Sequence, residues 1–163
     1  MPRQRAEDRV PAAKGDRLIS VNRRARHDYE ILDSVEAGLV LTGTEIKSIR
    51  AGRANIAGAF ARFDRGEPWL HNAHIAPYPA AGPAAQHDPL RPRKLLLHRK
   101  EIGRLGHSAD TQRLTIVPLR LYIRNHRAKV ELALARGRRE YDRREVIKQR
   151  DAAREMARAR RRG

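Results

Sequence analysis

Alternating apolar and polar residues in the second half of the chain predict two long β-strands. Within residues 115–124, one face carries Val117, Leu119, Leu121 and Ile123, and the other carries Arg120, Tyr122 and Arg124. After a turn at residues 125–127, the alternation continues with Ala128, Val130, Leu132 and Leu134 between Lys129, Glu131, Ala133 and Ala135. A period of two is typical of half-buried strands, so we predict an antiparallel hairpin with one charged, solvated face.

Four shorter runs earlier in the chain also have strand character. They cover residues 29–32, 38–41, 60–63 and 69–75, and a turn at 64–67 joins the last two. Several short strands separated by turns favour a small barrel over a doubly wound sheet.

Two helices are predicted inside this β framework. A capping box formed by Thr42 and Glu45 begins the first helix, which buries two isoleucines and ends near Gly52. The second helix covers residues 98–106 and turns an isoleucine and a leucine inward.

The ends of the chain and one internal loop lack a periodic apolar face. Residues 1–18 are predicted to be a disordered arm, and the folded barrel then covers 19–135. Five of the nine prolines lie between residues 76 and 93, which predicts a long loop there. The segment 136–163 has twelve Lys and Arg against five Asp and Glu, a net +7, and its apolar stripe is thin. We expect this tail to need a surface on which to fold.

The charge of the whole chain narrows the choice of partner. Its 163 residues suit one domain with tails, and 36 Lys and Arg against 19 Asp and Glu give a formal net charge of +17. Such an excess indicates a polyanionic partner. Aromatic residues make up only 4% of the chain, so backbone and arginine contacts should dominate over base stacking.

Several classes of protein are excluded by what the sequence lacks. It has no cysteine, which excludes disulfide scaffolds, thiol nucleophiles and sulfur-ligated zinc sites. It also has no long apolar run and no secretory signal pattern. We therefore expect a cytoplasmic protein with no membrane partner.

Histidines are the first candidates for catalysis or metal binding, but their spacing does not support either role. His71 and His74 lie at an odd separation on one predicted strand and would point to opposite faces. His87 and Asp88 are adjacent in the proline-rich loop, and no Gly-x-Ser-x-Gly elbow accompanies them. Phosphate-binding glycine loops and grouped carboxylates are also missing. No catalytic residue, metal site or cofactor is predicted.

Basic residues, in contrast, are clustered. Residues 22–27 read Asn-Arg-Arg-Ala-Arg-His, which offers an amide and three guanidiniums, those of Arg23, Arg24 and Arg26, whose planar forks can each take two phosphate oxygens. Further members of the predicted basic face are Lys47, Arg50, Arg93, Lys94, Arg120, Arg124 and Lys129. Such a face is the electrostatic footprint of nucleic-acid binding, but charge alone does not choose between RNA and DNA.

Four segments together resemble the SsrA-binding protein family, also called small protein B. They are NRRARHDYEI (22–31), EAGLVLTGTEIKSIRAGRANI (36–56), HDPLRPRKLLLHRKEI (87–102) and KVELALARGRREYDRREVIKQRDAAREM (129–156). The resemblance implies an oligonucleotide-binding-type antiparallel β-barrel with flanking α-helices and a basic C-terminal tail that is disordered or helical. It also implies a non-enzymatic role, in which the protein binds transfer-messenger RNA (SsrA RNA) and delivers it to stalled 70S ribosomes for trans-translation and ribosome rescue. Elongation factor Tu and alanyl-tRNA synthetase would be partners through the shared RNA.

The resemblance also assigns individual residues. RNA contacts are expected at Asn22, His27, Glu36, Leu97 and Lys129. Glu36 would accept a hydrogen bond from a base edge or orient a neighbouring arginine, and the structural alternative is a turn carboxylate. Ribosome contacts are expected in the tail at Gly137, Arg138, Arg139, Tyr141, Asp142, Arg143 and Arg144. At position 113 the chain has Arg where the family often has Gly.

Two other function classes share some of these features. A ribosome-associated or assembly RNA-binding protein would have the same charge, size and barrel, and a nuclease would share the charge. The joint presence of EAGLVLTGTEIKS and the DRRE tail favours the SsrA-binding role over both.

Overall fold

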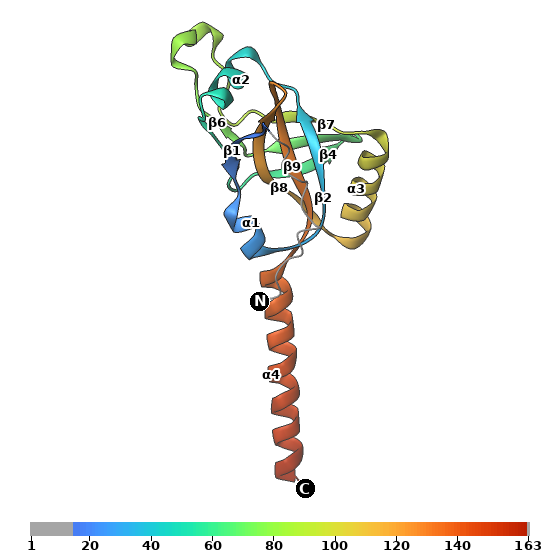
Figure 1. The fold of residues 1–163 in the computed structure, drawn as a ribbon. Coiled ribbons are helices and arrows are strands. Elements are labelled where there is room, and N and C mark those ends of the chain that lie inside the picture. The colour runs from blue at the N-terminus through green and yellow to red at the C-terminus, as the bar shows by residue number, and fades with distance from the viewer. Residues whose placement is uncertain (1–14, 163) are drawn as a thin grey trace.

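The chain folds into a β-barrel from which one long helix projects (Figure 1). The computed structural model describes residues 15–162, without the side chains of 139–148 and 162. The strands are β1 (Arg17–Val21), β2 (Tyr29–Leu39), β3 (Ala54–Asn55), β4 (Phe60–Asp64), β5 (Glu67–His71), β6 (His74–Ile75), β7 (Arg93–Leu96), β8 (Thr115–Arg124) and β9 (Arg127–Gly137). The helices are α1 (Arg23–Asp28), α2 (Gly43–Arg50), α3 (Arg99–Gln112) and α4 (Arg138–Arg162), with short 3-10 turns η2 (Pro79–Ala81) and η3 (Pro83–Ala85).

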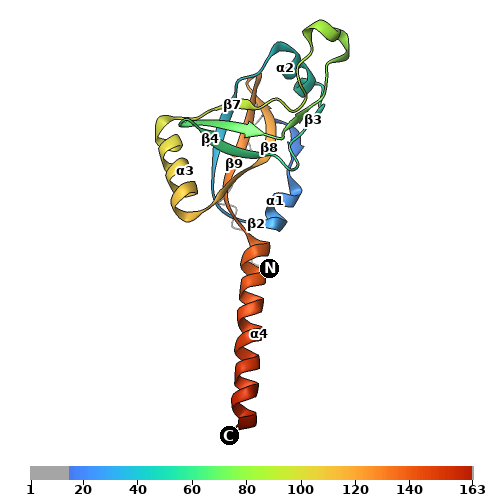
Figure 2. The same ribbon diagram turned by 180° about the vertical axis from the view of Figure 1, so that it is seen from behind.

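Antiparallel pairing closes the main sheet into a ring. The strands follow one another in the order β8, β4, β5, β7, β2 and β9, and β9 pairs again with β8. β1 pairs with β8 beside this ring, and β3 and β6 form a separate two-stranded ladder. Viewed from behind, α2 lies at the end of the barrel opposite α4, and α3 lies along its side (Figure 2). The predicted mainly β barrel with flanking helices is confirmed.

The buried apolar residues form two clusters. The larger one fills the barrel and includes Val35, Leu70, Leu95, Val130 and Leu132. The smaller one lies between α1 and the other face of β8 and β9, where it contains Ala25, Val117, Leu119, Ala133 and Ala135. α1 therefore covers a part of the sheet that would otherwise expose small apolar side chains.

The predicted hairpin of β8 and β9 is confirmed, but its division into faces is partly wrong. The register of the two strands shifts between Pro118 and Arg120, because proline lacks the N–H that a regular ladder needs. As a result Val117 and Leu119 pack in the small cluster, whereas Leu121 packs inside the barrel. A period of two holds only within an uninterrupted ladder, so a bulge exchanges the faces.

The predicted solvated face of this hairpin is also less exposed than expected. Tyr122 is 1% exposed and Glu131 is fully buried. Arg120 donates to the Glu131 carboxylate at 2.5 Å, and its guanidinium lies 5.2 Å from the centre of the Tyr122 ring. Long polar side chains thus cover one another on the outside of the barrel.

Three short predicted strands change their bounds. The runs at 29–32 and 38–41 belong to one strand, β2, whose polar middle is held by pairing with β9 from Tyr29 to Gly38. The run at 69–75 is instead divided, because Asn72 has a positive φ of 59° between β5 and β6. His71 and His74 therefore lie on different strands. The predicted turn at 64–67 is confirmed, with Asp64 opposite Glu67.

The first predicted helix is confirmed and the second is longer than predicted. The Thr42 side chain accepts from the Glu45 backbone, and the Glu45 carboxylate accepts from the Thr42 backbone, which completes the capping box of α2. α3 continues past Gly106, which lies beside the Phe63 ring, and ends at Arg113 with left-handed backbone angles (φ 52°, ψ 47°). Glycine at 106 permits close packing and does not stop the helix.

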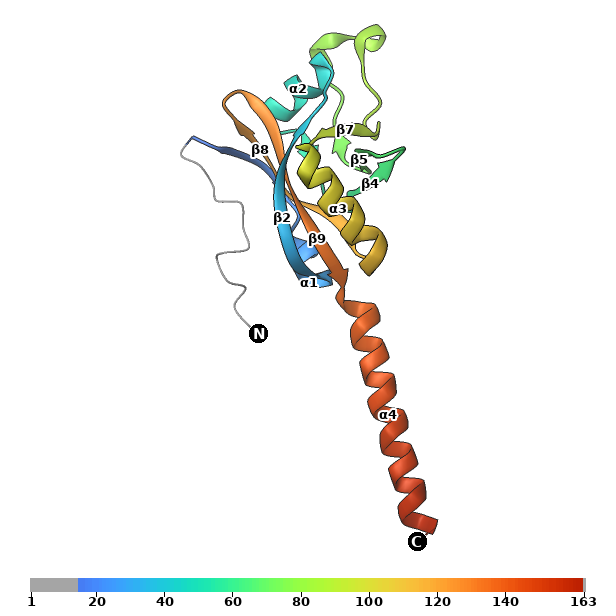
Figure 3. The same ribbon diagram turned by 90° about the vertical axis from the view of Figure 1, so that its right-hand side faces the viewer.

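The structure describes the C-terminal segment of the chain but only part of the predicted N-terminal arm. The first fourteen residues of the predicted arm lie outside the described part, and the ordered chain includes strand β1 from Arg17, two residues before the predicted start of the fold. The C-terminal segment forms α4, which leaves the barrel directly after β9 (Figure 3). Within residues 15–162, no helix combines the length and apolar character that crossing a bilayer requires.

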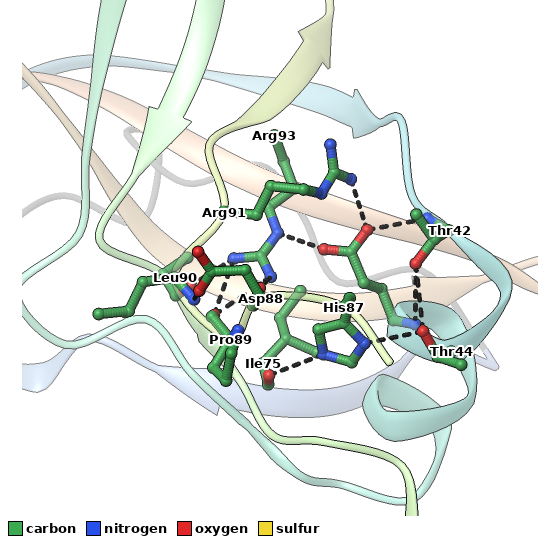
Figure 4. A network of polar contacts seen from close by, with 11 residues as sticks. Thr42, Thr44, Ile75, His87, Asp88, Pro89, Leu90, Arg91 and Arg93 are labelled. Carbon is green, nitrogen blue, oxygen red and sulfur yellow. Dashed lines mark hydrogen bonds and ion pairs between the residues drawn. The ribbon is translucent and has the colours of Figure 1, made fainter. Parts of the chain in front are cut away.

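A buried ion pair secures the proline-rich loop at residues 76–92 (Figure 4). The Arg93 guanidinium, which is fully buried, donates to Glu45 at 2.5 Å and to the backbone oxygens of Ala73, Asp88 and Pro89. Arg93 is therefore a structural residue and does not belong to the predicted basic face. A charged side chain is stable at this depth because every bond it needs is supplied by the protein.

Candidate RNA-binding surface

A groove on the outside of the barrel brings together three residues that the sequence places far apart. Glu36 on β2, Leu97 after β7 and Lys129 on β9 all line it, and its volume is about 280 Å³. Its remaining lining residues are Gly38, Leu96, His98 and Glu101. We call this feature the Glu36 groove.

Strand register explains why these residues meet. Gly38 lies directly opposite Lys129 on one side and directly opposite Leu96 on the other. A Cβ atom at Gly38 would stand 3.3 Å from the Leu96 Cβ and 3.7 Å from the Lys129 Nζ. Glycine therefore leaves room for the Lys129 ammonium to lie across β2, so that this charge enters the groove.

Glu36 is a strand residue, and the alternative of a turn carboxylate is wrong. Its side chain is 25% exposed, and its Oε2 atom accepts from Arg124 at 2.5 Å and from the Tyr122 hydroxyl. Burial, followed by the hydrogen bond to Glu36, raises the pKa of Tyr122, so this hydroxyl keeps its proton and donates. Glu36 is thus paired with a neighbouring arginine, as one of the sequence hypotheses anticipated.

The positive charge available at the groove comes from fewer residues than the sequence suggested. Arg120 pairs with Glu131, and Arg124 pairs with both Asp16 and Glu36. Among the described residues, Lys129 and Arg127 have no carboxylate within ion-pair distance. These two cations are therefore better placed than Arg120 or Arg124 to bind phosphate.

A second cavity continues the Glu36 groove towards α2. Its volume is about 290 Å³, and it shares Gly38, Leu96 and Lys129 with the groove. Its other lining residues are Leu39, Leu41, Ile46, His126, Arg127 and Ala128. An apolar floor with basic residues at the rim suits a base or ribose whose phosphate stays outside.

The candidates on α2 and β7 lie around this region. Arg50 donates to the backbone oxygen of His126 at 3.2 Å, which ties α2 to the β8–β9 turn. The Lys47 ammonium lies 5.6 Å from the centre of the Tyr78 ring in the proline-rich loop. Lys94 pairs with Glu67 at 3.1 Å, so part of its charge is already compensated.

The residues of the first motif form a separate group at the other end of β2. Arg24 and His27 are exposed on α1, and Arg26 is partly buried. Asn22 is buried and donates to the Pro118 backbone oxygen at 3.0 Å, so this amide holds α1 against the bulge of β8. Seven strand residues separate α1 from Glu36, which corresponds to roughly 25 Å of extended chain.

This second group borders a wide hollow. It has a volume of about 590 Å³ and is lined by Asn22, Arg24, Ala25, Asp28, Tyr29, Ala57, Gly58, Ala59, Phe60, Thr115 and Val117. The structure thus distributes the predicted RNA contacts over two surfaces. Asn22, Arg24, Arg26 and His27 belong to one, and Glu36, Leu97 and Lys129 to the other.

The predicted tail residues follow directly after the barrel. Gly137 ends β9 and pairs with Tyr29, and Arg138 begins α4. Arg139, Tyr141, Asp142, Arg143 and Arg144 lie in the first turns of this helix. Their positions along α4 place the whole motif where the helix leaves the barrel.

His87 in the proline-rich loop bonds to two other segments of the chain. The His87 Nδ1 atom hydrogen-bonds with the Thr44 hydroxyl at 2.8 Å, and its Nε2 atom donates to the Ile75 backbone oxygen at 2.9 Å. Among the described residues, no hydrogen bond or ion pair joins His87 to the Asp88 carboxylate. Its ring therefore fastens the proline-rich loop to α2 (Figure 4). Among the side chains that the structure describes, no group of three or more His, Asp or Glu could hold a metal ion.

Sequence reasoning missed Gly38, Tyr122 and Arg127 as parts of the candidate site. Gly38 belongs to the quoted EAG segment, and its need for a small side chain could have been suspected there. Tyr122 was assigned only to a strand face, because nothing local reveals that its hydroxyl reaches Glu36 on another strand.

Together these features define a basic antiparallel β-barrel protein of the oligonucleotide-binding type, with a surface groove and a projecting C-terminal helix. The family model described as SmpB protein matches residues 19–162. The chain belongs to the SmpB family. It is 56% identical to the SsrA-binding protein of Thermobifida fusca over 162 residues, 99% of each chain, and 55% identical to that of Roseiflexus castenholzii over 144 residues, 88% of this chain and 91% of the relative.

A solved structure supports the same assignment. A chain described as "tmRNA-SmpB: a journey to the center of the bacterial ribosome" is 54% identical and has a TM-score of 0.60. The match covers 72% of this chain and 82% of that chain.

Proposed function

We propose that this chain binds transfer-messenger RNA through its barrel and delivers that RNA to stalled ribosomes for trans-translation. The observation that carries the proposal is the Glu36 groove, where β2, β7 and β9 bring together Glu36, Leu97 and Lys129. The chain's relatives are SsrA-binding proteins, and the similar solved structure is described with tmRNA and the bacterial ribosome.

The chemistry of the groove suits a folded RNA with an exposed base. Lys129 supplies a cation for phosphate, Leu97 supplies an apolar contact, and Glu36 supplies an acceptor for a base N–H group. With a volume of about 280 Å³ the groove is too small to admit a double helix of DNA or RNA, so it would contact the edge of the RNA. The role is one of binding and positioning, without a chemical reaction on the RNA.

In the proposed function, the Glu36 groove and the α1 surface bind the RNA, and the start of α4 binds the ribosome. The Glu36 groove would hold the transfer-RNA-like part of the RNA, and Asn22 and His27 remain proposed contacts on the α1 surface. The motif from Gly137 to Arg144 would bind the ribosome. Elongation factor Tu and alanyl-tRNA synthetase would act on the same RNA, and work on ribosomes would place the protein in the cytoplasm.

Recovery of the bound RNA tests the proposal directly. The protein is purified from cells with its RNA, and the RNA is sequenced. Transfer-messenger RNA should be enriched over transfer RNA and ribosomal RNA, and the Lys129→Ala variant should reduce that enrichment. Enrichment of ribosomal RNA alone would instead indicate a ribosome-associated or assembly factor and would contradict the proposal.

A further inference from the structure

Among the described residues, hydrogen-bond donors reach one of the two carboxylate oxygens of Glu36, Oε2. Oε2 accepts from the Tyr122 hydroxyl and, at 2.5 Å, from Arg124. Within the described part of the chain, Oε1 makes no hydrogen bond. Glu36 lines the groove, so its Oε1 atom can still accept hydrogen bonds from a molecule bound there.

The two groups that hold Glu36 are themselves fixed. The guanidiniums of Arg120 and Arg124 each lie over the Tyr122 ring, 5.2 Å from its centre. Arg124 donates twice to Asp16, at 2.8 and 2.7 Å, and Arg120 donates to Glu131 at 2.5 Å. Cation–π contacts and paired forks leave Tyr122 little freedom to rotate.

This arrangement also solves an electrostatic problem. A carboxylate in a surface that binds phosphates is repelled by them unless a cation compensates its charge. Arg124 supplies that charge behind Glu36, on the side of Oε2, while the Lys129 Nζ reaches across Gly38 in the groove itself. Lys129 is therefore left for phosphate.

We propose that Tyr122 and Arg124 are positioning residues of the Glu36 groove, which hold the Glu36 carboxylate so that Oε1 accepts from an amino group of an unpaired RNA base. Neither residue needs to touch the RNA. The inference rests on the proposed function, because it explains how Glu36 is held at the proposed RNA site. Oε1 has lone pairs to accept from an N–H donor, and the exocyclic amino group of an adenine, cytosine or guanine supplies such a donor.

A double-mutant cycle between Tyr122 and Glu36 tests the proposal. The full chain is prepared as wild type, Tyr122→Phe, Glu36→Ala and the double variant, and its affinity for the transcribed transfer-RNA-like domain of transfer-messenger RNA is measured at constant salt. Tyr122→Phe keeps the buried ring and removes only the hydroxyl. It should weaken binding about threefold to tenfold in the wild-type background and should have no effect in the Glu36→Ala background.

Two further variants guard against an effect of folding alone. Tyr78→Phe removes a hydroxyl from the proline-rich loop, where no hydrogen bond of that hydroxyl is seen among the described residues, and should leave affinity unchanged. Arg124→Lys keeps the charge but cannot span both Asp16 and Glu36, so it should retain part of the affinity that Arg124→Gln loses. Denaturant midpoints of all variants show that each is folded during the binding measurement.

The outcomes separate the inference from the function on which it rests. If Glu36→Ala weakens binding and Tyr122→Phe does not, or if Tyr122→Phe weakens binding equally in both backgrounds, the positioning role is wrong. If Glu36→Ala leaves affinity unchanged, the groove is not the RNA site, and both the inference and that part of the proposed function fail.

Discussion

Glu45 and Arg93 show how single buried charges organise this protein. Burial by itself would raise the pKa of Glu45, but hydrogen bonds from Arg91, the Thr42 backbone and Arg93 outweigh it and lower the pKa from 4.5 to about 2. Desolvation lowers the pKa of Arg93 from its usual value, although the pairing with Glu45 opposes that shift. Both side chains are fully buried, and loss of Glu45 would leave the Arg93 guanidinium without a carboxylate, whereas Glu45 also pairs with Arg91.

The Glu45→Gln variant should therefore be less stable at neutral pH by about 3–5 kcal/mol. The folded-state pKa of Glu45 lies below its ordinary value, so the stabilisation is complete above about pH 4.5 and is lost as the pH falls towards 2. Urea unfolding of both proteins at pH 7, 4.5 and 2.5 should show the difference shrinking with acid. A difference that is independent of pH would mean that Glu45 stabilises the fold by packing alone.

Lys129 and Leu132 lie on the same strand but should respond differently to substitution. Lys129→Ala removes one proposed phosphate contact and should weaken RNA binding by about 1–3 kcal/mol, with little change in stability. Leu132→Ala opens a cavity in the barrel core and should reduce stability by about 2–5 kcal/mol. Gel-shift affinity and urea midpoints measure the two effects.

Lys100→Ala provides a control of equal charge from the exposed surface of α3. It should weaken RNA binding less than Lys129→Ala does, since Lys100 does not line the groove. An unfolded Lys129→Ala variant would contradict the position of that side chain in the groove, outside the barrel core.

Single residues that bend or end a strand or helix explain much of the departure of this fold from the alternating pattern in its sequence. The bulge at Pro118 changes which residues of β8 enter the barrel, and Asn72 separates β5 from β6. α3 ends because Arg113 adopts left-handed backbone angles. Each of these positions is a single residue, but each one changes the direction or face of a whole element.

Arg113→Gly should stabilise the protein by about 0.5–1 kcal/mol. Left-handed angles are unfavourable for a residue with a Cβ atom and cost glycine almost nothing. Lys100→Gly removes the same charge from a helical position and should destabilise by up to about 1 kcal/mol. Equal shifts of the two melting temperatures in one direction would show that charge, and not backbone conformation, dominates at position 113.

Helix α4 should separate RNA capture from activity on the ribosome. The simultaneous substitution Asp142→Ala, Arg143→Ala and Arg144→Ala should leave affinity for transfer-messenger RNA nearly unchanged, because the Glu36 groove lies on the barrel. It should abolish alanine transfer to peptides on ribosomes stalled on truncated message. Gel shifts and a tagging assay on the same variant measure both, and parallel loss of both activities would place α4 in RNA capture.

The folding of α4 itself should depend on its surroundings. A segment with a net +7 and a thin apolar stripe repels itself in water and becomes more stable as a helix when phosphates neutralise its arginines. Circular dichroism of the isolated 138–163 peptide should therefore show mostly coil. A stable helix in buffer alone would contradict folding on an RNA surface.

Charge is shared between the two parts of the molecule. Of the formal +17, the segment 136–163 carries +7 and the rest of the chain carries +10. In the barrel several arginines are compensated by carboxylates, while Lys129 and Arg127 remain beside the groove. The net charge of the whole chain therefore attracts RNA over long distances, while only a few side chains are placed to contact its phosphates.

RNA affinity should fall steeply with salt. Each phosphate contact on a single-stranded segment releases about 0.7 counterion, so the logarithm of affinity should decline linearly with the logarithm of salt concentration. Lys129→Ala should make that slope shallower by roughly one contact. An affinity that is constant between low and moderate salt would contradict the electrostatic contribution.

Local patterns in the sequence were sufficient for β8, β9, the capping box of α2 and the proline-rich loop. These features depend on side chains within a few residues of one another, which is the range over which periodicity and caps act. The recognisable segments also identified Glu36, Leu97 and Lys129, which the fold brings into one groove.

Tertiary structure alone determined how these parts are used. Arg93 has the same charge as the other basic residues, but its position beside Glu45 and three backbone oxygens makes it a core residue. Asn22 is buried, and its amide donates to the Pro118 backbone oxygen at the β8 bulge. The Tyr122 hydroxyl on β8 donates to Glu36 on β2, across the intervening strand β9. The physical reason is that burial and partner choice depend on strands distant in sequence, whose register and bulges no local period encodes.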